Sequence, residues 1–279
     1  MAELRGIDVS DNQGYIDWAK VKADGVQFAI LRSTRGSGNP DKQLASNIKG
    51  CLSVGIPMDF YKYRYGNTEA KTRSEAKKVI DTLISLGVKP NKNTVIWDDV
   101  EDNCMTNLSK SQLTKLCNIF REEIEKAGFG YGLYMGMYDY NNEINGKEIK
   151  DDCWVARYYN GYNVMDFSQN PNEKYKPKVA DSSKLWGWQY TSSGRVDGIK
   201  GNVDLDIAYY DIKETEVAPE YYDTPEFTLI DSLNKIGADS SYQGRKWIAH
   251  KNGITNYKGT AEQNLKMLDL LNSGKLIKL

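Results

Sequence analysis

The feature that most constrains the fold is an alternation of strand-like and helix-like segments over the first 210 residues. Helical patterns at 18–23, 42–54, 68–86 and 109–127 separate the first five strand-like segments. Strands that alternate with helices pair in parallel, and eight of them predict an α/β fold, an irregular TIM-like β/α barrel. The eight apolar runs are Gly6–Ser10, Phe28–Ser33, Met58–Tyr63, Thr94–Glu101, Tyr131–Met135, Trp154–Tyr158, Trp186–Tyr190 and Val203–Ala208.

The last connection of the barrel departs from this pattern. Between Tyr190 and Val203 the chain is rich in Gly and Ser and shows no helical period. A parallel crossover needs about a dozen residues and normally contains a helix. We therefore expect the last two strands to be antiparallel, and the barrel to lack some outer helices on its C-terminal side.

The pattern of the barrel stops near residue 210, which predicts a catalytic barrel over 1–210. Residues 211–226 are acidic and contain Pro219 and Pro225, as expected of an extended, exposed linker. Residues 227–279 predict a small all-α module of three short helices, with capping patterns that begin at Thr228, Ser240 and Thr260. Self-association would help a module whose core is so small.

Composition excludes several classes of protein. The 37 basic and 38 acidic residues give a net charge of -1, which argues against nucleic-acid binding. No apolar run approaches the roughly 18 residues of a membrane span, and the first residues form no signal peptide. The four cysteines form no zinc or disulfide pattern, and His250 is the single histidine. We expect no metal or cofactor, and a reaction that depends on carboxylates.

Carboxylates gather where several predicted strands end. Asp99 and Glu101 are two residues apart, so they share one face of a strand, and their like charges raise at least one pKa. A general acid needs such a raised pKa. Barrel enzymes place catalytic residues at the C-terminal ends of strands, where Asp8 and Asp204 are also expected. Asp206 shares a face with Asp204 and could replace it.

Aromatic and basic side chains are expected at the same strand ends as substrate-binding residues. Carboxylates walled by rings are typical of glycoside hydrolysis, in which an acid protonates the leaving oxygen and rings stack on sugars. Several of these side chains could instead fill the barrel or pair with a buried carboxylate. The candidates are Tyr61, Tyr63, Tyr134, Arg157, Tyr159, Trp186 and Trp188.

Four motifs together resemble the glycoside hydrolase family 25 lysozymes over residues 4–210. These N-acetylmuramidases occur in many phage endolysins. The resemblance implies a flattened β/α barrel that lacks some helices. It also implies cleavage of the β-1,4 bond from N-acetylmuramic acid to N-acetylglucosamine in peptidoglycan. The motifs are Gly6-Ile7-Asp8-Val9-Ser10 with Ile16-Asp17-Trp18, Asp99-Val100-Glu101, Trp186-Gly187-Trp188-Gln189-Tyr190 and Val203-Asp204.

The resemblance also implies roles for the four acids. Glu101 matches the general acid, Asp99 the residue that orients the 2-acetamido group, and Asp8 and Asp204 two further acids of the cleft. Whether the acetamido group or a water attacks stays open. Asp98 departs from the apolar residue expected in a barrel wall, and Asp206 from the Asn that the family often has.

The C-terminal segment resembles a short module at the C-termini of some Gram-positive phage amidases and lysozymes. The implied partners are peptidoglycan and a wall-associated polymer. The implied location is the host cytoplasm until lysis and the cell wall afterwards. Candidate wall-binding residues, each of which could also be a core or cap residue, are Tyr242, Arg245, Trp247, Tyr257 and Gln263.

Two other functions remain open at this stage. Clustered acids also hold Mg²⁺ or Ca²⁺ in phosphoester hydrolases, although this chain lacks the usual His and Lys partners. A barrel could also bind glycan without cleaving it. The intact pair of Asp99 and Glu101 favours an enzyme.

Overall fold

The computed structural model of the protein describes residues 3–146, 148–149, 151–210, 212–213, 215–218 and 228–279. Internal contacts divide the chain into two units, one up to Glu216 and the other from Val217. Each unit is described by itself.

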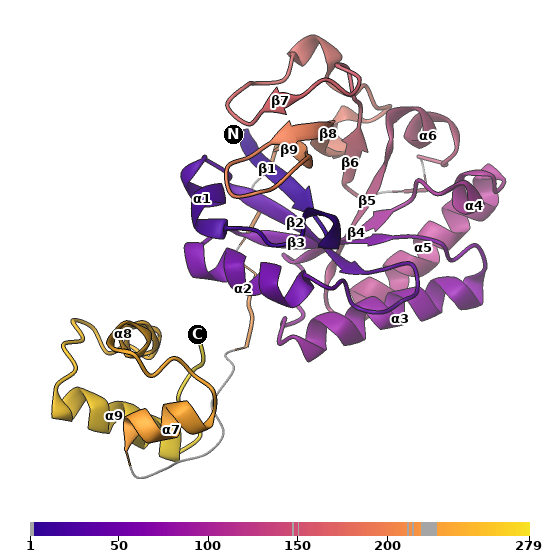
Figure 1. Cartoon of the computed structure of the whole chain (residues 1–279). Coiled ribbons are helices and arrows are strands. Elements are labelled where there is room, and N and C mark those ends of the chain that lie inside the picture. Colours follow the sequence, from indigo (N-terminus) through magenta and orange to yellow (C-terminus); the bar gives the residue numbers. More distant parts are fainter. Residues whose placement is uncertain (1–2, 147, 150, 211, 214, 219–227) are drawn as a thin grey trace. The chain divides into compact units, whose positions relative to one another are not determined.

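Eight strands of the first unit close into a barrel (Figure 1). Neighbours from β1 to β6 pair in parallel, and β6 pairs in parallel with β8. The last strand, β9, runs antiparallel to both β8 and β1 and closes the barrel. The predicted strands and the antiparallel final pair are therefore confirmed. The barrel strands are β1 (Leu4–Val9), β2 (Phe28–Thr34), β3 (Met58–Tyr63), β4 (Val95–Asp99), β5 (Gly130–Gly136), β6 (Cys153–Ala156), β8 (Leu185–Arg195) and β9 (Val203–Ala208).

Helices cover the barrel where the parallel crossovers lie. Thr68 caps α3 and Ser109 caps α5, each through its side chain. After β6, the two-residue strand β7 (Met165–Asp166) and two 3-10 turns, η2 (Glu173–Tyr175) and η3 (Ser182–Lys184), are the only regular elements before β8 in the described chain. The barrel thus lacks outer helices on its C-terminal side. Its helices are α1 (Trp18–Ala23), α2 (Leu44–Val54), α3 (Glu69–Ser85), α4 (Asn103–Thr106), α5 (Lys110–Lys126) and α6 (Met137–Asn142), with a 3-10 turn η1 at Asp11–Gln13.

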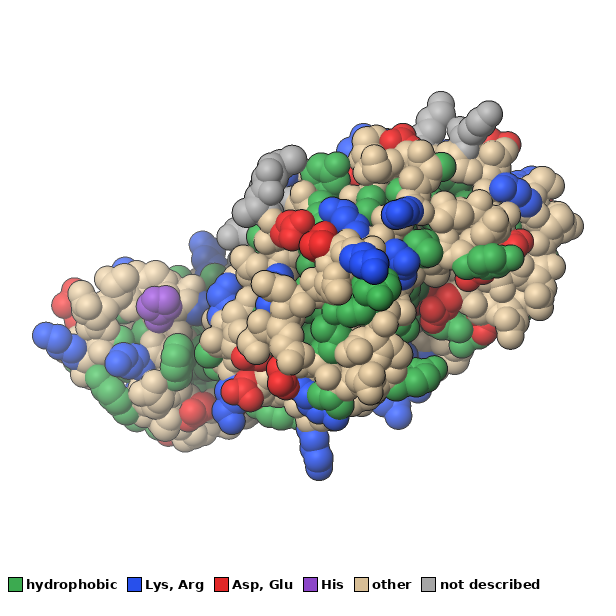
Figure 2. Space-filling model, turned by 90° about the horizontal axis from the view of Figure 1, so that it is seen from above, with side chains coloured by type: hydrophobic (Ala, Val, Ile, Leu, Met, Phe, Trp, Pro, Cys, Tyr) green, Lys and Arg blue, Asp and Glu red, His purple; other side chains and the backbone are tan. Residues whose placement is uncertain are grey.

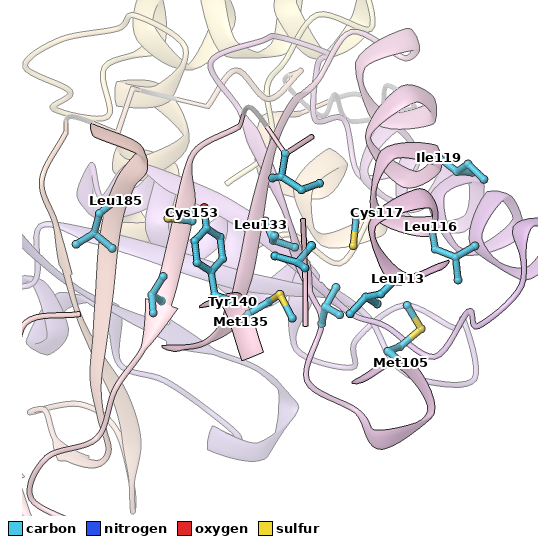
Figure 3. Close-up of a cluster of buried hydrophobic side chains, with 14 residues drawn as sticks. Met105, Leu113, Leu116, Cys117, Ile119, Leu133, Met135, Tyr140, Cys153 and Leu185 are labelled. Carbon is cyan, nitrogen blue, oxygen red and sulfur yellow. The ribbon is translucent and has the colours of Figure 1, made fainter. Parts of the chain in front are cut away.

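Two apolar layers hold the barrel together. Inside it, the Trp97 ring packs on Trp186 and Trp154, with centroids 4.4 and 6.0 Å away. Outside it, residues of α5 such as Leu113 pack against Leu133 and other side chains of β5 and β6 (Figure 3). The interior rings thus fill part of the barrel interior.

Asp98, the unexpected acid in the barrel wall, is fully buried outside the barrel beside an equally buried arginine. Both of its carboxylate oxygens accept hydrogen bonds from Arg64 Nη1, at 2.8 and 3.0 Å. The Tyr131 hydroxyl donates to it at 3.2 Å, and Glu75 accepts from Arg64 Nε at 3.0 Å. Buried charges persist only when they are paired in this way, so the role of Asp98 is structural.

The described residues of the second unit form three helices, α7 (Leu229–Lys235), α8 (Tyr242–Lys251) and α9 (Ala261–Asn272). Leu233, Ile248 and Met267 bring all three helices into one apolar cluster. Ser241, not the predicted Ser240, caps α8, because the Ser241 hydroxyl accepts the Gly244 N–H at 3.0 Å.

The first part of the predicted linker packs on the barrel. Ile212 contacts the barrel interior, the Thr215 hydroxyl donates to the Met58 carbonyl, and the Lys89 N–H donates to the Glu216 carbonyl at 2.8 Å. The barrel unit therefore ends at Glu216 rather than at residue 210. The predicted stretch from 219 to 226 lies outside the described residues.

The surface carries interspersed charges of both signs, and the single histidine, purple in Figure 2, is exposed on α8. All four cysteines are free thiols. None of the described helices combines the length and the apolarity that crossing a membrane requires.

Candidate active site

The four predicted acids line one cavity of about 470 Å³. Asp8 lies near the end of β1, Asp99 ends β4, and Glu101 follows two residues later. Because β9 is antiparallel, its first residues lie at the same edge of the barrel, and Asp204 is the direct ladder partner of Asp8. The cavity is lined by Asp8, Asn12, Arg32, Arg35, Gly36, Tyr61, Tyr63, Tyr65, Asp99, Glu101, Tyr134, Trp154, Tyr158, Gln189 and Asp204.

Burial and mutual repulsion raise the pKa of every acid in this group. Burial raises the pKa of Asp99 well above its ordinary value, and the Glu101 carboxylate raises it further. Burial also raises the pKa of Asp8, and among its charged neighbours Asp204 raises it most. Burial and Glu101 raise the pKa of Asp204 to about 7. Carboxyls this close share protons, so they do not all ionise at neutral pH.

Glu101 differs from the other three acids because its side chain is exposed at the cavity mouth. Partial desolvation raises its pKa, and the nearby Asp102 and Asp139 raise it further. Asp102 itself accepts the Cys104 N–H at 2.8 Å, which holds its pKa low and keeps it ionised. A protonated carboxyl at an open mouth can donate a proton to a bound leaving group.

A glutamine that sequence reasoning did not identify positions Asp8. Gln189 Nε2 donates to Asp8 Oδ2 at 2.6 Å. Its Oε1 accepts hydrogen bonds from the hydroxyls of Tyr134, at 2.7 Å, and Tyr158. Because both tyrosines donate to the oxygen, the amide nitrogen must face the carboxylate.

Asp206 does not take the place of Asp204. It is fully buried below the cavity, where Trp154 Nε1 donates to its Oδ1 at 2.9 Å. Its second oxygen is buried without a hydrogen-bond partner. Asp204 is therefore the acid of β9 that a substrate could contact.

Of the seven predicted substrate-binding residues, Tyr61, Tyr63 and Tyr134 line the cavity, and four do not. Trp154 of β6 points into the barrel, and Tyr158, two residues after the end of β6, also lines the cavity. Arg157 points away and donates to the Tyr175 and Lys176 carbonyls, at 2.8 and 3.0 Å. It thus pairs with backbone carbonyls, not with a buried carboxylate. Tyr159 stacks on Tyr175, with centroids 4.9 Å apart.

The two tryptophans of β8 do not share a face, although residues two apart in a regular strand would do so. Opposite β6 the register jumps from Cys153↔Leu185 to Trp154↔Gly187, which leaves Trp186 as an extra residue. Such a bulge changes the alternation of side chains. Trp186 points into the barrel floor against Trp97, whereas Trp188 packs outside it against Tyr190. Neither lines the cavity.

Several lining residues were not predicted. Asn12 lies in the 3-10 turn η1, and Arg35, Gly36 and Tyr65 lie in loops, all just beyond strand ends, where alternation gives no signal. Tyr158 and Gln189 lie within predicted strand segments, so the correct inward face would have identified them. No group of three His, Cys, Asp or Glu side chains within the described ranges is placed to hold a metal ion.

The five wall-binding candidates of the second unit divide into two kinds. Tyr242 and Trp247 are exposed, at 50% and 58% of their surface. Tyr257 is buried, and its hydroxyl accepts a hydrogen bond from Arg245 Nε at 3.0 Å. Gln263 completes the capping box of α9 with Thr260. Tyr242 and Trp247 are thus the most exposed of the five candidates.

Comparisons with known proteins show what the chain is similar to. The autolytic lysozyme of Clostridium acetobutylicum is 28% identical over 204 residues, which are 73% of this chain and 55% of that protein. The chain thus matches only about half the length of that relative. The catalytic domain of endolysin ply40 from bacteriophage P40 of Listeria monocytogenes has 25% identity and a TM-score of 0.61. The match covers 76% of this chain and 95% of that domain.

A separate, shorter similarity joins the chain to the L-alanyl-D-glutamate peptidase of Listeria phage A118. It has 44% identity over 52 residues, 19% of this chain and 18% of that protein. The profile of the glycosyl hydrolases family 25 matches residues 7–199, which include three of the four cavity acids. The chain therefore belongs to the glycosyl hydrolases family 25.

Proposed function

We propose that the chain cleaves the β-1,4 bond between N-acetylmuramic acid and N-acetylglucosamine in peptidoglycan, as an endolysin that lyses bacteria. The observation that carries the proposal is the cavity that joins Asp8, Asp99, Glu101 and Asp204 and is walled by tyrosines. Glycoside hydrolysis needs a carboxyl that keeps its proton and further carboxylates that support a cationic sugar.

Each acid has a role in this reaction. Glu101 protonates the glycosidic oxygen of the leaving sugar, because burial and the nearby Asp102 and Asp139 raise its pKa above the ordinary value, as a general acid requires. Asp99, deeper in the cavity, accepts a hydrogen bond from the 2-acetamido N–H and orients that group. Asp8 and Asp204 lie opposite each other and supply the negative charge that stabilises the developing cation.

The second unit would attach the enzyme to the cell wall and so raise its concentration at the substrate. The similarity to the phage peptidase is about as long as the segment 228–279. That peptidase is named for cleaving a different bond. Attachment of both proteins to the same wall therefore explains a shared segment better than a shared reaction does. Exposed Tyr242 and Trp247 are the residues we expect to contact the wall polymer. The protein would remain in the host cytoplasm until lysis.

The test is mass spectrometry of fragments that the protein releases from purified Gram-positive walls. We expect new reducing ends of N-acetylmuramic acid and no new free amino groups. Glu101→Gln should lose about 10²- to 10⁴-fold in kcat, the usual contribution of a general acid. Glu122→Gln, on the exposed face of α5, is the control and should retain activity.

Other outcomes would overturn the proposal. New reducing ends of N-acetylglucosamine would mean that the protein cleaves the other glycosidic bond of the glycan. New free amino groups would mean that it is a peptidase or an amidase. Full activity of the Glu101→Gln variant would mean that Glu101 is not the general acid. Loss of activity in EDTA would favour the metal-dependent phosphoester hydrolase, and glycan binding without any cleavage would mean a binding protein.

A further inference from the structure

An arginine in the catalytic cavity has no anionic partner. Arg35 lines the cavity, and its Nε is buried without a hydrogen-bond acceptor. No ion pair joins its guanidinium to any carboxylate among the residues that the structure describes. A buried donor without a partner costs free energy, more so when it is charged. Such a group requires a functional explanation.

The other cations nearby are already paired. Arg32 donates to Asp41, with Nε and Oδ2 2.8 Å apart, and also pairs with Asp11. Buried Lys62 lies 3.8 Å from Glu75 and donates to the Arg35 carbonyl at 3.2 Å. Arg35 is therefore the cation of this cavity that is left to meet an anion of the substrate.

The surroundings of Arg35 are fixed rather than loose. Its N–H donates to the Asn39 carbonyl at 2.9 Å, and its carbonyl accepts the Gly38 N–H at 2.8 Å. At Gly36, an added Cβ would lie 2.6 Å from the Tyr65 ring, so only glycine lets this ring lie against the loop. Tyr65 in turn packs on Tyr63, with centroids 4.9 Å apart. The loop and the two rings line the same cavity as Arg35, and these contacts fix their positions.

From this geometry we propose that Arg35, with Gly36, Tyr63 and Tyr65, forms a subsite for a carboxylate of the glycan substrate. The subsite rests on the proposed muramidase function. N-acetylmuramic acid carries a lactyl ether on O3, next to the C2 acetamido group that Asp99 would orient. That ether ends in a free carboxylate or, in peptide-bearing walls, continues into a stem peptide with carboxylates of its own. A planar guanidinium binds carboxylates in a bidentate manner, so Arg35 would select muramic acid over N-acetylglucosamine at this position.

The test compares three soluble substrates by kcat/KM. The first is a peptide-free glycan chain with free lactyl carboxylates, the second is the same chain with these carboxylates converted to methylamides, and the third carries stem peptides. We expect wild-type protein to prefer a carboxylate-bearing chain over the methylamide chain by about 10- to 100-fold, the usual strength of a charge-assisted hydrogen bond. Arg35→Gln should abolish this preference, because it should lower kcat/KM for the preferred chain about 10- to 100-fold more than kcat/KM for the methylamide chain.

A control variant at a surface arginine and the alternative outcomes complete the test. Arg73→Gln removes the same charge from the surface of α3, where Arg73 pairs with Glu123, and should keep the preference. If cleavage of the first substrate depends on Arg35, the lactyl carboxylate is the group that it binds. If only cleavage of the third substrate depends on Arg35, the group is a carboxylate of the stem peptide. A wild-type protein that does not discriminate, or an Arg35→Gln variant that loses all substrates equally, would overturn the subsite. Absence of reducing N-acetylmuramic acid from every substrate would instead overturn the proposed function.

Discussion

Asp59 should make the barrel less stable as the pH rises, and Asp59→Asn should remove this effect. The side chain lies on β3 with 2% of its surface exposed. Its Oδ1 accepts the Val95 N–H at 2.8 Å, and its Oδ2 accepts a weaker bond from Trp97 Nε1 at 3.4 Å. Burial outweighs both bonds and raises the pKa from 3.8 to about 7.

The sign and size of the effect follow from linkage. Between pH 3.8 and about 7 the folded protein holds a proton that the unfolded chain releases. The free energy of unfolding therefore falls through this window and stays low above it. Three pKa units at 1.36 kcal/mol each amount to about 4 kcal/mol as an upper limit. The asparagine amide would lose the weak bond to Trp97, at a cost of about 1 kcal/mol.

We therefore expect Asp59→Asn to be about 3 kcal/mol more stable than wild type at pH 8 and about 1 kcal/mol less stable at pH 4. Urea unfolding followed by tryptophan fluorescence at both pH values measures this, since five of the six tryptophans lie in the barrel unit. Taking the difference between the two proteins cancels the titration of other acids. A difference that does not change with pH would refute the reasoning.

Two further predictions concern stability. Asp98→Ala leaves the buried Arg64 with Glu75 as its remaining carboxylate partner, so it should cost about 3 kcal/mol, the low end for a broken buried ion pair. In the same urea assay, a loss below about 1 kcal/mol would mean that Glu75 alone compensates Arg64. Thr260→Ala removes the cap of α9 and should cost the second unit about 1 kcal/mol. Circular dichroism should show its transition move while the barrel transition does not, and a moved barrel transition would contradict this.

The strands and the acids that meet in the cavity could be predicted because both depend on local rules. Parallel strands bring their C-terminal ends to one edge, so Asp8, Asp99 and Glu101 reach one cavity whatever the details of packing. The antiparallel direction of β9 followed from a connection without helical period, and it places Asp204 beside Asp8.

Other parts of the site depend on information that the sequence does not carry locally. Strand alternation gives two faces but does not say which is inward, and the wrong choice on β6 selected Arg157 instead of Tyr158. On β8 a bulge at Trp186 reverses the alternation midway. Arg35 and Tyr65 come from loops, whose positions depend on tertiary contacts such as that between Gly36 and the Tyr65 ring.

The reversed direction of β9 also decides where the chain leaves the barrel. With eight parallel strands, the polypeptide would emerge beside the catalytic acids. Here β9 ends at Ala208 on the opposite face, and the following residues reach Met58 at the beginning of β3. Whatever is joined after Glu216 begins away from the substrate entrance. Recombination at this point would therefore exchange C-terminal segments without rebuilding the end of the barrel that holds the cavity.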